Sequence, residues 1–184
     1  MPDPQVDCRA LLEAASFAAR AHRHQLRKDG HTPYAAHPFR VCLIVRHVFE
    51  IDDPEVLSAA LLHDTIEDTP ADYDDLEAKF GARIAGWVGA LSKDMRLPDA
   101  EREAAYIATL AGADPAVKIV KLADVFDNLT DSRHLSPAAR RRTAERSRKY
   151  LAAIEADLPD VARRPLELVR QLFAGHGDSD LPAA

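Results

Sequence analysis

The sequence contains little cysteine, little glycine and no long apolar run. Its two cysteines, Cys8 and Cys42, form no metal-type or redox pair, and Cys42 lies in an apolar stretch, which predicts a buried free thiol in a reducing compartment. No run approaches the roughly 20 apolar residues of a membrane helix. The N-terminus lacks the basic region and apolar core of a signal peptide. We therefore expect a cytoplasmic protein without a membrane partner.

An excess of positive charge is also absent. The chain has 24 Lys and Arg against 30 Asp and Glu, a net charge of -6, which argues against nucleic acid as a partner. An anionic small molecule is compatible with this balance if basic side chains gather locally. A length of 184 residues with 47% hydrophobic content suits one packed domain and is cramped for two. The sequence does not predict an oligomeric state.

Apolar residues recur at helical spacing, the seven glycines are few beside many alanines and leucines, and no segment alternates convincingly as a strand does. Proline near a first turn and Asp or Ser before it mark several helix starts. The expected helices are Asp7–Gln25, one from His37–Pro38, one after Asp53, Asp72–Phe80 stopped by Gly81, Ala82–Ser92, one after Pro98, one after Asp114, one from Ser136–Pro137 to about Leu158, and Asp160–Phe173. The prediction is one all-α domain over residues 1–175, with a frayed polar tail at 176–184.

The segment "ALLHDTIEDT" carries three carboxylates directly after an apolar run. Carboxylates that enter a core need a partner that stabilises them. In a continuous helix, His63 and Glu67 would share one face and Asp64 and Asp68 the next. The adjacent imidazole and carboxylate suit Mn, Fe, Zn or Mg, which leaves the two later acids for proton transfer.

Two distant residues extend this set, and each has an alternative interpretation. His37, in "YAAHPF", is either a ligand or a histidine at a helix end. Asp124, in "KLADVFDNL", is either a ligand or a buried acid paired with Lys121 three residues earlier. Together with His63 and Asp64 they supply two imidazoles and two carboxylates.

The motifs "YAAHP", "ALLHDTIEDT" and "KLADVFDNL", in this order, resemble those of the HD-domain hydrolases of the Rel/SpoT type, and of their stand-alone relatives, the small alarmone hydrolases. The resemblance runs from Phe17 to Tyr150. It implies a single helical HD domain with a central metal site, which hydrolyses a small nucleotide.

The resemblance also implies a role for each matching position. Asn128 would contact the nucleotide sugar, and Arg27 and Lys28 would border the base and phosphates. Arg146 and Tyr150 would join them in the pocket, whereas Arg140 to Arg142 are expected to form a solvated helix surface. One divalent metal, Mn²⁺ in most relatives, would be held by His37, His63, Asp64 and Asp124, and the catalytic acids would be Glu67 and Asp68.

The implied reaction removes the 3′-pyrophosphate of (p)ppGpp or its adenine analogue (p)ppApp. Relatives often read "LADKLYNLR" or "LADRxxNxR", so Val125, Asp127 and Thr130 depart from the pattern and are expected to alter base and phosphate recognition. Two alternatives stay open: a general HD nucleotidase acting on other nucleotides, and a non-catalytic alarmone sensor.

Overall fold

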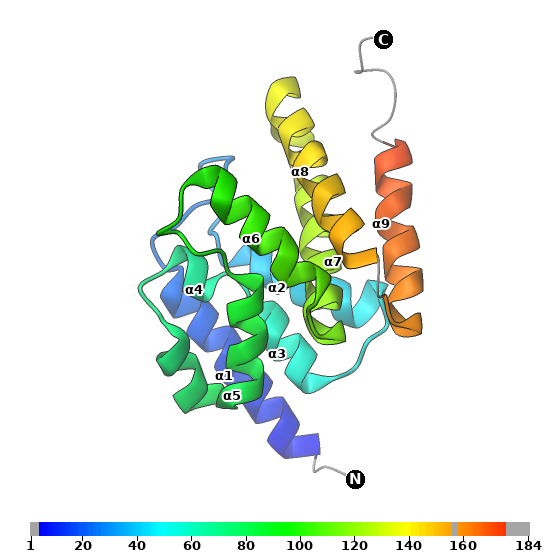
Figure 1. The fold of residues 1–184 in the computed structure, drawn as a ribbon. Helices are drawn as coiled ribbons and strands as arrows, with labels where there is room; N and C mark the ends of the chain where they lie inside the picture. Colours follow the sequence, from blue (N-terminus) through cyan, green and yellow to red (C-terminus); the bar gives the residue numbers. More distant parts are fainter. Residues whose placement is uncertain (1–3, 156–157, 176–184) are drawn as a thin grey trace, which may run out of the picture.

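The computed structural model describes residues 4–155 and 158–175, which form helices and no β-strand (Figure 1). The all-α prediction is confirmed. The predicted tail, 176–184, lies outside the described residues. The helices are α1 (Pro4–Ala21), α2 (Ala36–Leu43), α3 (Pro54–Leu62), α4 (Thr65–Asp68), α5 (Tyr73–Leu91), α6 (Asp99–Ala111), α7 (Pro115–Asp131), α8 (Pro137–Glu155) and α9 (Arg163–Gly175). Between them lie a π-helical segment, η1 (Ile44–Val48), and two 3₁₀ turns, η2 (Ser132–His134) and η3 (Asp160–Ala162).

Local capping starts several helices where the sequence predicts. The Asp53 side chain accepts a hydrogen bond from the Glu55 amide at 2.9 Å, and Pro54 begins α3. Asp114 does the same for the Ala116 amide at 2.8 Å before Pro115 begins α7. In both cases the carboxylate satisfies a first-turn donor that has no partner within the helix.

Helix α7 is the central element of the fold. It packs against α2, α3, α5, α8 and α9 (Figure 1). Side chains on most of its circumference are therefore buried. Its apolar residues form the core together with those of α2 and α3. The buried set on α7 also contains Lys121, Asp124 and Asp127. Burial of charged groups on a core helix requires compensating partners, and these partners make up the site described below.

The charged segment does not form the continuous helix that its spacing predicts. Helix α3 ends at Leu62, His63 and Asp64 form a turn, and the single turn α4 follows. Side chains take over the last carbonyls of α3: the Thr65 hydroxyl donates to Leu62 O at 2.6 Å and the His63 ring bonds Ala60 O at 2.8 Å. The positions of the four polar side chains are therefore set by this turn.

The loop after α1 brings further polar side chains to the same end of the fold. Helix α1 ends at Ala21, earlier than the predicted Gln25, and the chain then forms a short antiparallel bridge between Leu26 and Pro33. Gly30, at φ +79°, closes this turn in a backbone conformation that favours glycine. Arg27, Lys28 and Tyr34 lie on this loop. No helix in the described part of the chain is long and apolar enough to cross a membrane.

Candidate metal centre and pocket

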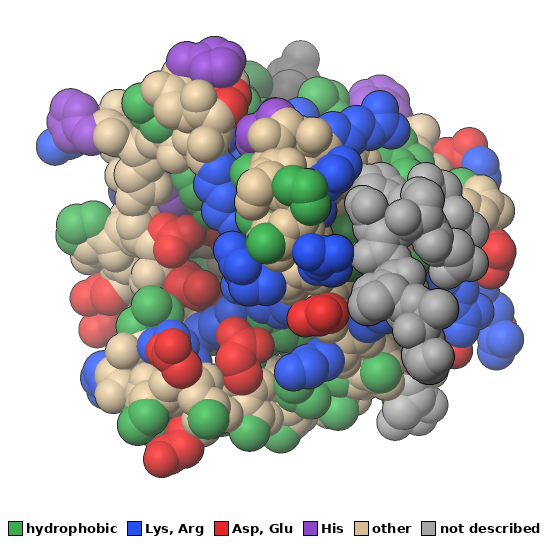
Figure 2. All heavy atoms as spheres, turned by 90° about the horizontal axis from the view of Figure 1, so that it is seen from above, with side chains coloured by type: hydrophobic (Ala, Val, Ile, Leu, Met, Phe, Trp, Pro, Cys, Tyr) green, Lys and Arg blue, Asp and Glu red, His purple; other side chains and the backbone are tan. Residues whose placement is uncertain are grey.

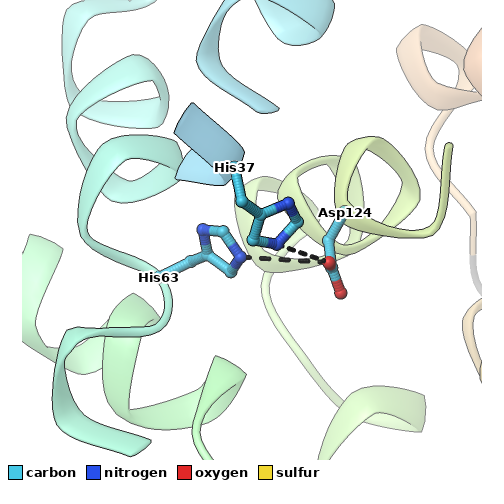
Figure 3. Close-up of side chains that lie close together, drawn as sticks. All are labelled: His37, His63 and Asp124. Atoms are coloured by element: carbon cyan, nitrogen blue, oxygen red, sulfur yellow. Dashed lines mark ion pairs between the residues drawn. The ribbon is translucent and has the colours of Figure 1, made fainter. Parts of the chain in front are cut away.

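Three buried side chains from three elements meet beside α7. His37 comes from α2, His63 from the turn after α3, and Asp124 from α7 (Figure 3). Asp124 Oδ1 lies 3.2 Å from His37 Nε2 and 3.9 Å from His63 Nε2. One ligand atom from each residue lies within 4.8 Å of the others, so the group could hold one metal ion.

The ring orientations of the two histidines fit a metal. His63 Nδ1 lies 2.8 Å from the Ala60 carbonyl, which only accepts, so Nδ1 carries the hydrogen and Nε2 presents a lone pair. This buried Nε2 has no hydrogen-bond partner among the described residues. His37 uses Nδ1 in the same way, toward Asp127 Oδ2 at 2.7 Å. Neutral imidazoles held from behind by an acceptor are the usual state of histidine ligands.

Asp64 borders this group. Its two carboxylate oxygens lie 3.4 Å from His37 Nε2 and 3.2 Å from His63 Nε2. Burial disfavours the charged carboxylate, but the His63 and His37 rings outweigh this effect and lower the pKa of Asp64. The structure thus brings together all four side chains predicted as ligands.

Both interpretations of Asp124 hold, one for each carboxylate oxygen. Oδ2 accepts a hydrogen bond from Lys121 Nζ at 2.7 Å, whereas Oδ1 faces the two histidines and accepts from Asn128. Burial opposes the charge of Asp124, but Lys121 and then His37 outweigh it and hold the pKa well below its usual range. Lys121 consequently leaves one oxygen of this carboxylate for a metal.

The predicted catalytic acids lie beside the histidine–aspartate group on α4. Glu67 Oε2 accepts from the Lys93 amide at 2.8 Å, and the Tyr34 hydroxyl lies 2.9 Å from Asp68 Oδ2 and 2.7 Å from Asp64 Oδ2. Lost hydration in the pocket raises the pKa of Glu67, and the same effect together with the charge of Asp64 raises that of Asp68. Both carboxyls therefore hold a proton more readily than free acids do.

A pocket opens over these residues, bounded by the loop after α1, by α4, by α7 and by α8. The metal-facing side chains of His37, Asp64 and Asp124 line its floor. His63 lies behind them, outside the lining. The walls include both predicted acids, Glu67 and Asp68, and all five side chains predicted to bind substrate: Arg27, Lys28, Asn128, Arg146 and Tyr150.

Positive charge gathers at the mouth of this pocket. Burial lowers the pKa of Lys28, and the nearby charges of Arg146, Arg27 and Arg142 lower it further. Figure 2 shows Lys and Arg side chains crowded near the middle of this face, next to Asp and Glu side chains. Neighbouring cations repel one another unless an anion lies between them, so the mouth of the pocket suits a phosphorylated ligand. Arg142, expected to be purely a surface residue, is exposed yet contributes to this field.

Arg27 has a second role within the protein. Its guanidinium donates to Asp131 Oδ2 at 2.7 and 3.0 Å and to Asn128 Oδ1 at 3.3 Å, and it lies 5.5 Å from the centre of the Tyr34 ring. This network joins the loop after α1 to the end of α7. These contacts therefore fix the position of Arg27, which is predicted to border the base, in the pocket wall.

Sequence reasoning missed two lysines in the pocket. The sequence indicates Lys121 only as a partner of Asp124, and it gives no signal for Lys93. Their ammonium groups lie 4.6 and 5.5 Å from the centre of the Tyr150 ring, and Lys93 also pairs with Glu103 at 2.9 Å. Lys93 lies in an irregular segment after α5, where no periodic pattern marks it. Contacts of that segment with α6 and α8 bring Lys93 to the site.

The three departures from the family pattern have different locations. Val125 lines the pocket, as expected. Thr130 does not: it is exposed, and its hydroxyl donates to Phe126 O on its own helix. Asp127 is buried behind His37. Asp127 and Thr130 therefore do not line the pocket, because successive residues of α7 point to different sides of the helix, and the expected effect on recognition stays a prediction for Val125 alone.

Comparison with known proteins places this site in a family. The HD-domain family model matches residues 14–157, which include every side chain described above. Human (Homo sapiens) MESH1, named guanosine-3′,5′-bis(diphosphate) 3′-pyrophosphohydrolase, is 39% identical over 169 residues, or 91% of this chain and 94% of the relative. The relative of the same name from Danio rerio is 43% identical over 141 residues, or 76% of this chain and 77% of its own length. SpoT of Escherichia coli K12, a bifunctional (p)ppGpp synthase/hydrolase, is 38% identical over 151 residues, which cover 78% of this chain and 21% of SpoT.

A solved structure agrees with the sequence relatives. It is described as a metazoan ortholog of SpoT that hydrolyzes ppGpp, and it superimposes with a TM-score of 0.77 at 31% identity. The match covers 93% of this chain and 97% of that one. The shared fold therefore extends over nearly the whole length of both chains.

Proposed function

Since this chain belongs to the HD-domain family, we propose that it is a 3′-pyrophosphohydrolase of the nucleotide alarmones (p)ppGpp or (p)ppApp. The observation that supports this most strongly is the presence in one pocket of a possible metal group, two carboxyls of raised pKa and a basic mouth. The human and zebrafish relatives are named for this reaction. Cytoplasmic location and the absence of nucleic-acid or membrane partners stay predictions.

We assign one divalent ion to His37, His63, Asp64 and Asp124, and propose Mn²⁺. Two imidazoles and two carboxylates, with no thiolate, suit this ion. When bound, the metal supplies a Lewis acid that lowers the pKa of water and polarises phosphoryl oxygens. Lys121 binds one oxygen of Asp124 and leaves the other facing the two histidines, and the acceptors behind the two histidines keep Nε2 directed at the site.

The acids carry out the proton transfers. The oxygen of water forms a bond to the phosphorus next to the ribose, the bond from that phosphorus to the 3′-oxygen breaks, and the released 3′-oxygen takes a proton. We propose that Glu67 and Asp68 divide these tasks, one orienting water and the other supplying the proton. A raised pKa favours the protonated form that the second task needs.

The basic mouth positions the flanking phosphates. Lys28 and Arg146 lie in the lining and carry charge that the phosphates would balance. Asn128, on α7 next to the acid ligand, is assigned to the nucleotide sugar. Val125 contributes an apolar wall where relatives often carry a cation, so the base preference is set by few polar contacts.

A nucleotide panel tests the proposal. Turnover of ppGpp, pppGpp, ppApp and pppApp would be compared with that of GTP, ATP and 5′-monophosphates in the presence of Mn²⁺, with products resolved by chromatography. We expect turnover only where a 3′-pyrophosphate is present, and the better of guanine and adenine identifies the natural base. Cleavage of a 5′-monophosphate with no reaction of the four alarmones would favour the general nucleotidase. Tight binding of an alarmone without turnover would favour the sensor.

A further inference from the structure

His37 is held from behind by a buried acid outside the ligand set. Asp127 Oδ2 lies 2.7 Å from His37 Nδ1, on the side of the ring away from Asp64 and Asp124. Asp127 is only 3% exposed, and it lies on α7 three residues after Asp124. Because a carboxylate accepts, Nδ1 donates, and Nε2 is the ring atom that faces the pocket floor.

Arg40 fixes this acid in place. Its guanidinium donates from Nε to Asp127 Oδ1 at 2.7 Å and from a terminal nitrogen to Oδ2 at 3.0 Å. Arg40 lies on α2 three residues after His37, so two residues of α2 pair with the same acid of α7. Such a two-point contact between arginine and carboxylate restricts the orientation of both groups.

We propose that Asp127 is a positioning residue for the metal ligand His37. It fixes the ring tautomer and orientation, and its negative charge makes Nε2 a stronger donor, as carboxylates behind histidine ligands do. The inference rests on the proposed metal site and adds to it a residue that departs from the family pattern "LADKLYNLR", in which tyrosine occupies this position. The acid thus belongs to the metal site and not to the nucleotide pocket.

Calorimetric titration of metal-free protein with Mn²⁺ tests this role. Asp127→Asn keeps an acceptor oxygen but loses the charge, and we expect a loss of affinity of about 10-fold; Asp127→Leu loses both, and we expect about 100-fold, the range found when such partners are removed. Asp131→Asn is the matched control. Asp131 also pairs with Arg40, at 3.1 Å, but contacts neither histidine, so Mn²⁺ affinity should not change.

A second measurement separates positioning from general damage. ¹⁵N NMR of the metal-free protein should show a hydrogen-bonded His37 Nδ1–H in the wild type and the loss of that hydrogen bond in Asp127→Leu. Activity of Asp127→Asn should return to within about threefold of the wild type at saturating Mn²⁺, since the ligand itself is intact.

Wild-type Mn²⁺ affinity in both Asp127 variants would overturn the inference, as would an equal loss in Asp131→Asn. Asp127→Asn is isosteric and decides the matter alone if Asp127→Leu does not fold. The proposed function fails separately, if the wild-type protein binds Mn²⁺ but releases no pyrophosphate from an alarmone. If the wild type binds no divalent metal, both fail.

Discussion

Asp68→Asn and Glu67→Gln are each expected to lower kcat by about a hundredfold or more, the range found when an acid–base group is removed. Each side chain lies in the pocket wall beside the metal group, but neither belongs to the cluster that could hold the ion. Both amides keep an oxygen that can accept the existing hydrogen bond, from the Lys93 amide or the Tyr34 hydroxyl. Mn²⁺ content should therefore match that of the wild type.

Stability gives an independent check on these variants. The raised pKa values mean that the folded protein disfavours the charged form of both carboxyls. A neutral amide removes that cost, so the melting temperature should stay the same or rise slightly. Asp94→Asn is the control: it changes a partly exposed carboxyl that pairs with Arg96 outside the pocket, and it should keep full activity. Near-normal turnover in either test variant would remove that residue from the mechanism.

His63→Ala is expected to abolish metal binding. Activity should fall by more than the roughly hundredfold that follows mutation of a residue that only supports a metal ligand. The Nε2 atom of His63 is buried, lacks a hydrogen-bond partner among the described residues and faces the carboxylates of Asp64 and Asp124. Elemental analysis of purified protein should find about one Mn²⁺ per wild-type chain, and far less in the variant.

His47→Ala provides the matched control for that experiment. His47 is exposed on the π-helical segment and does not line the pocket, so its loss should change neither metal content nor turnover. Circular dichroism would show whether His63→Ala keeps its helical content. A folded His63→Ala protein with wild-type metal content would exclude His63 as a ligand.

The sequence predicts most of the helices because their signals are local. The acid and proline pairs at Asp53–Pro54 and Asp114–Pro115 begin α3 and α7 as expected, and Gly81 interrupts the helical backbone of α5 at φ +85°. The four predicted ligands could be identified because each lies in a short motif whose residue types suit one ion, and the packing of α2, α3 and α7 brings them together.

The parts that escaped prediction depend on contacts between distant segments. Helix α3 ends before His63 because side chains of the turn bond its carbonyls, which spacing alone does not reveal. The family pattern places position 127 near the nucleotide, but the rotation of α7 directs Asp127 to His37 and Arg40. Lys93 reaches the pocket only through the packing of the segment after α5.

The position of bond cleavage tests the central claim most directly. The protein would be incubated with Mn²⁺ and the alarmone that it turns over best in H₂¹⁸O, and the products would be analysed by mass spectrometry. Attack on the phosphorus next to the ribose predicts intact pyrophosphate with one ¹⁸O and an unlabelled 5′-phosphorylated nucleoside. Orthophosphate as the first product, or ¹⁸O in the nucleoside product, would contradict the account.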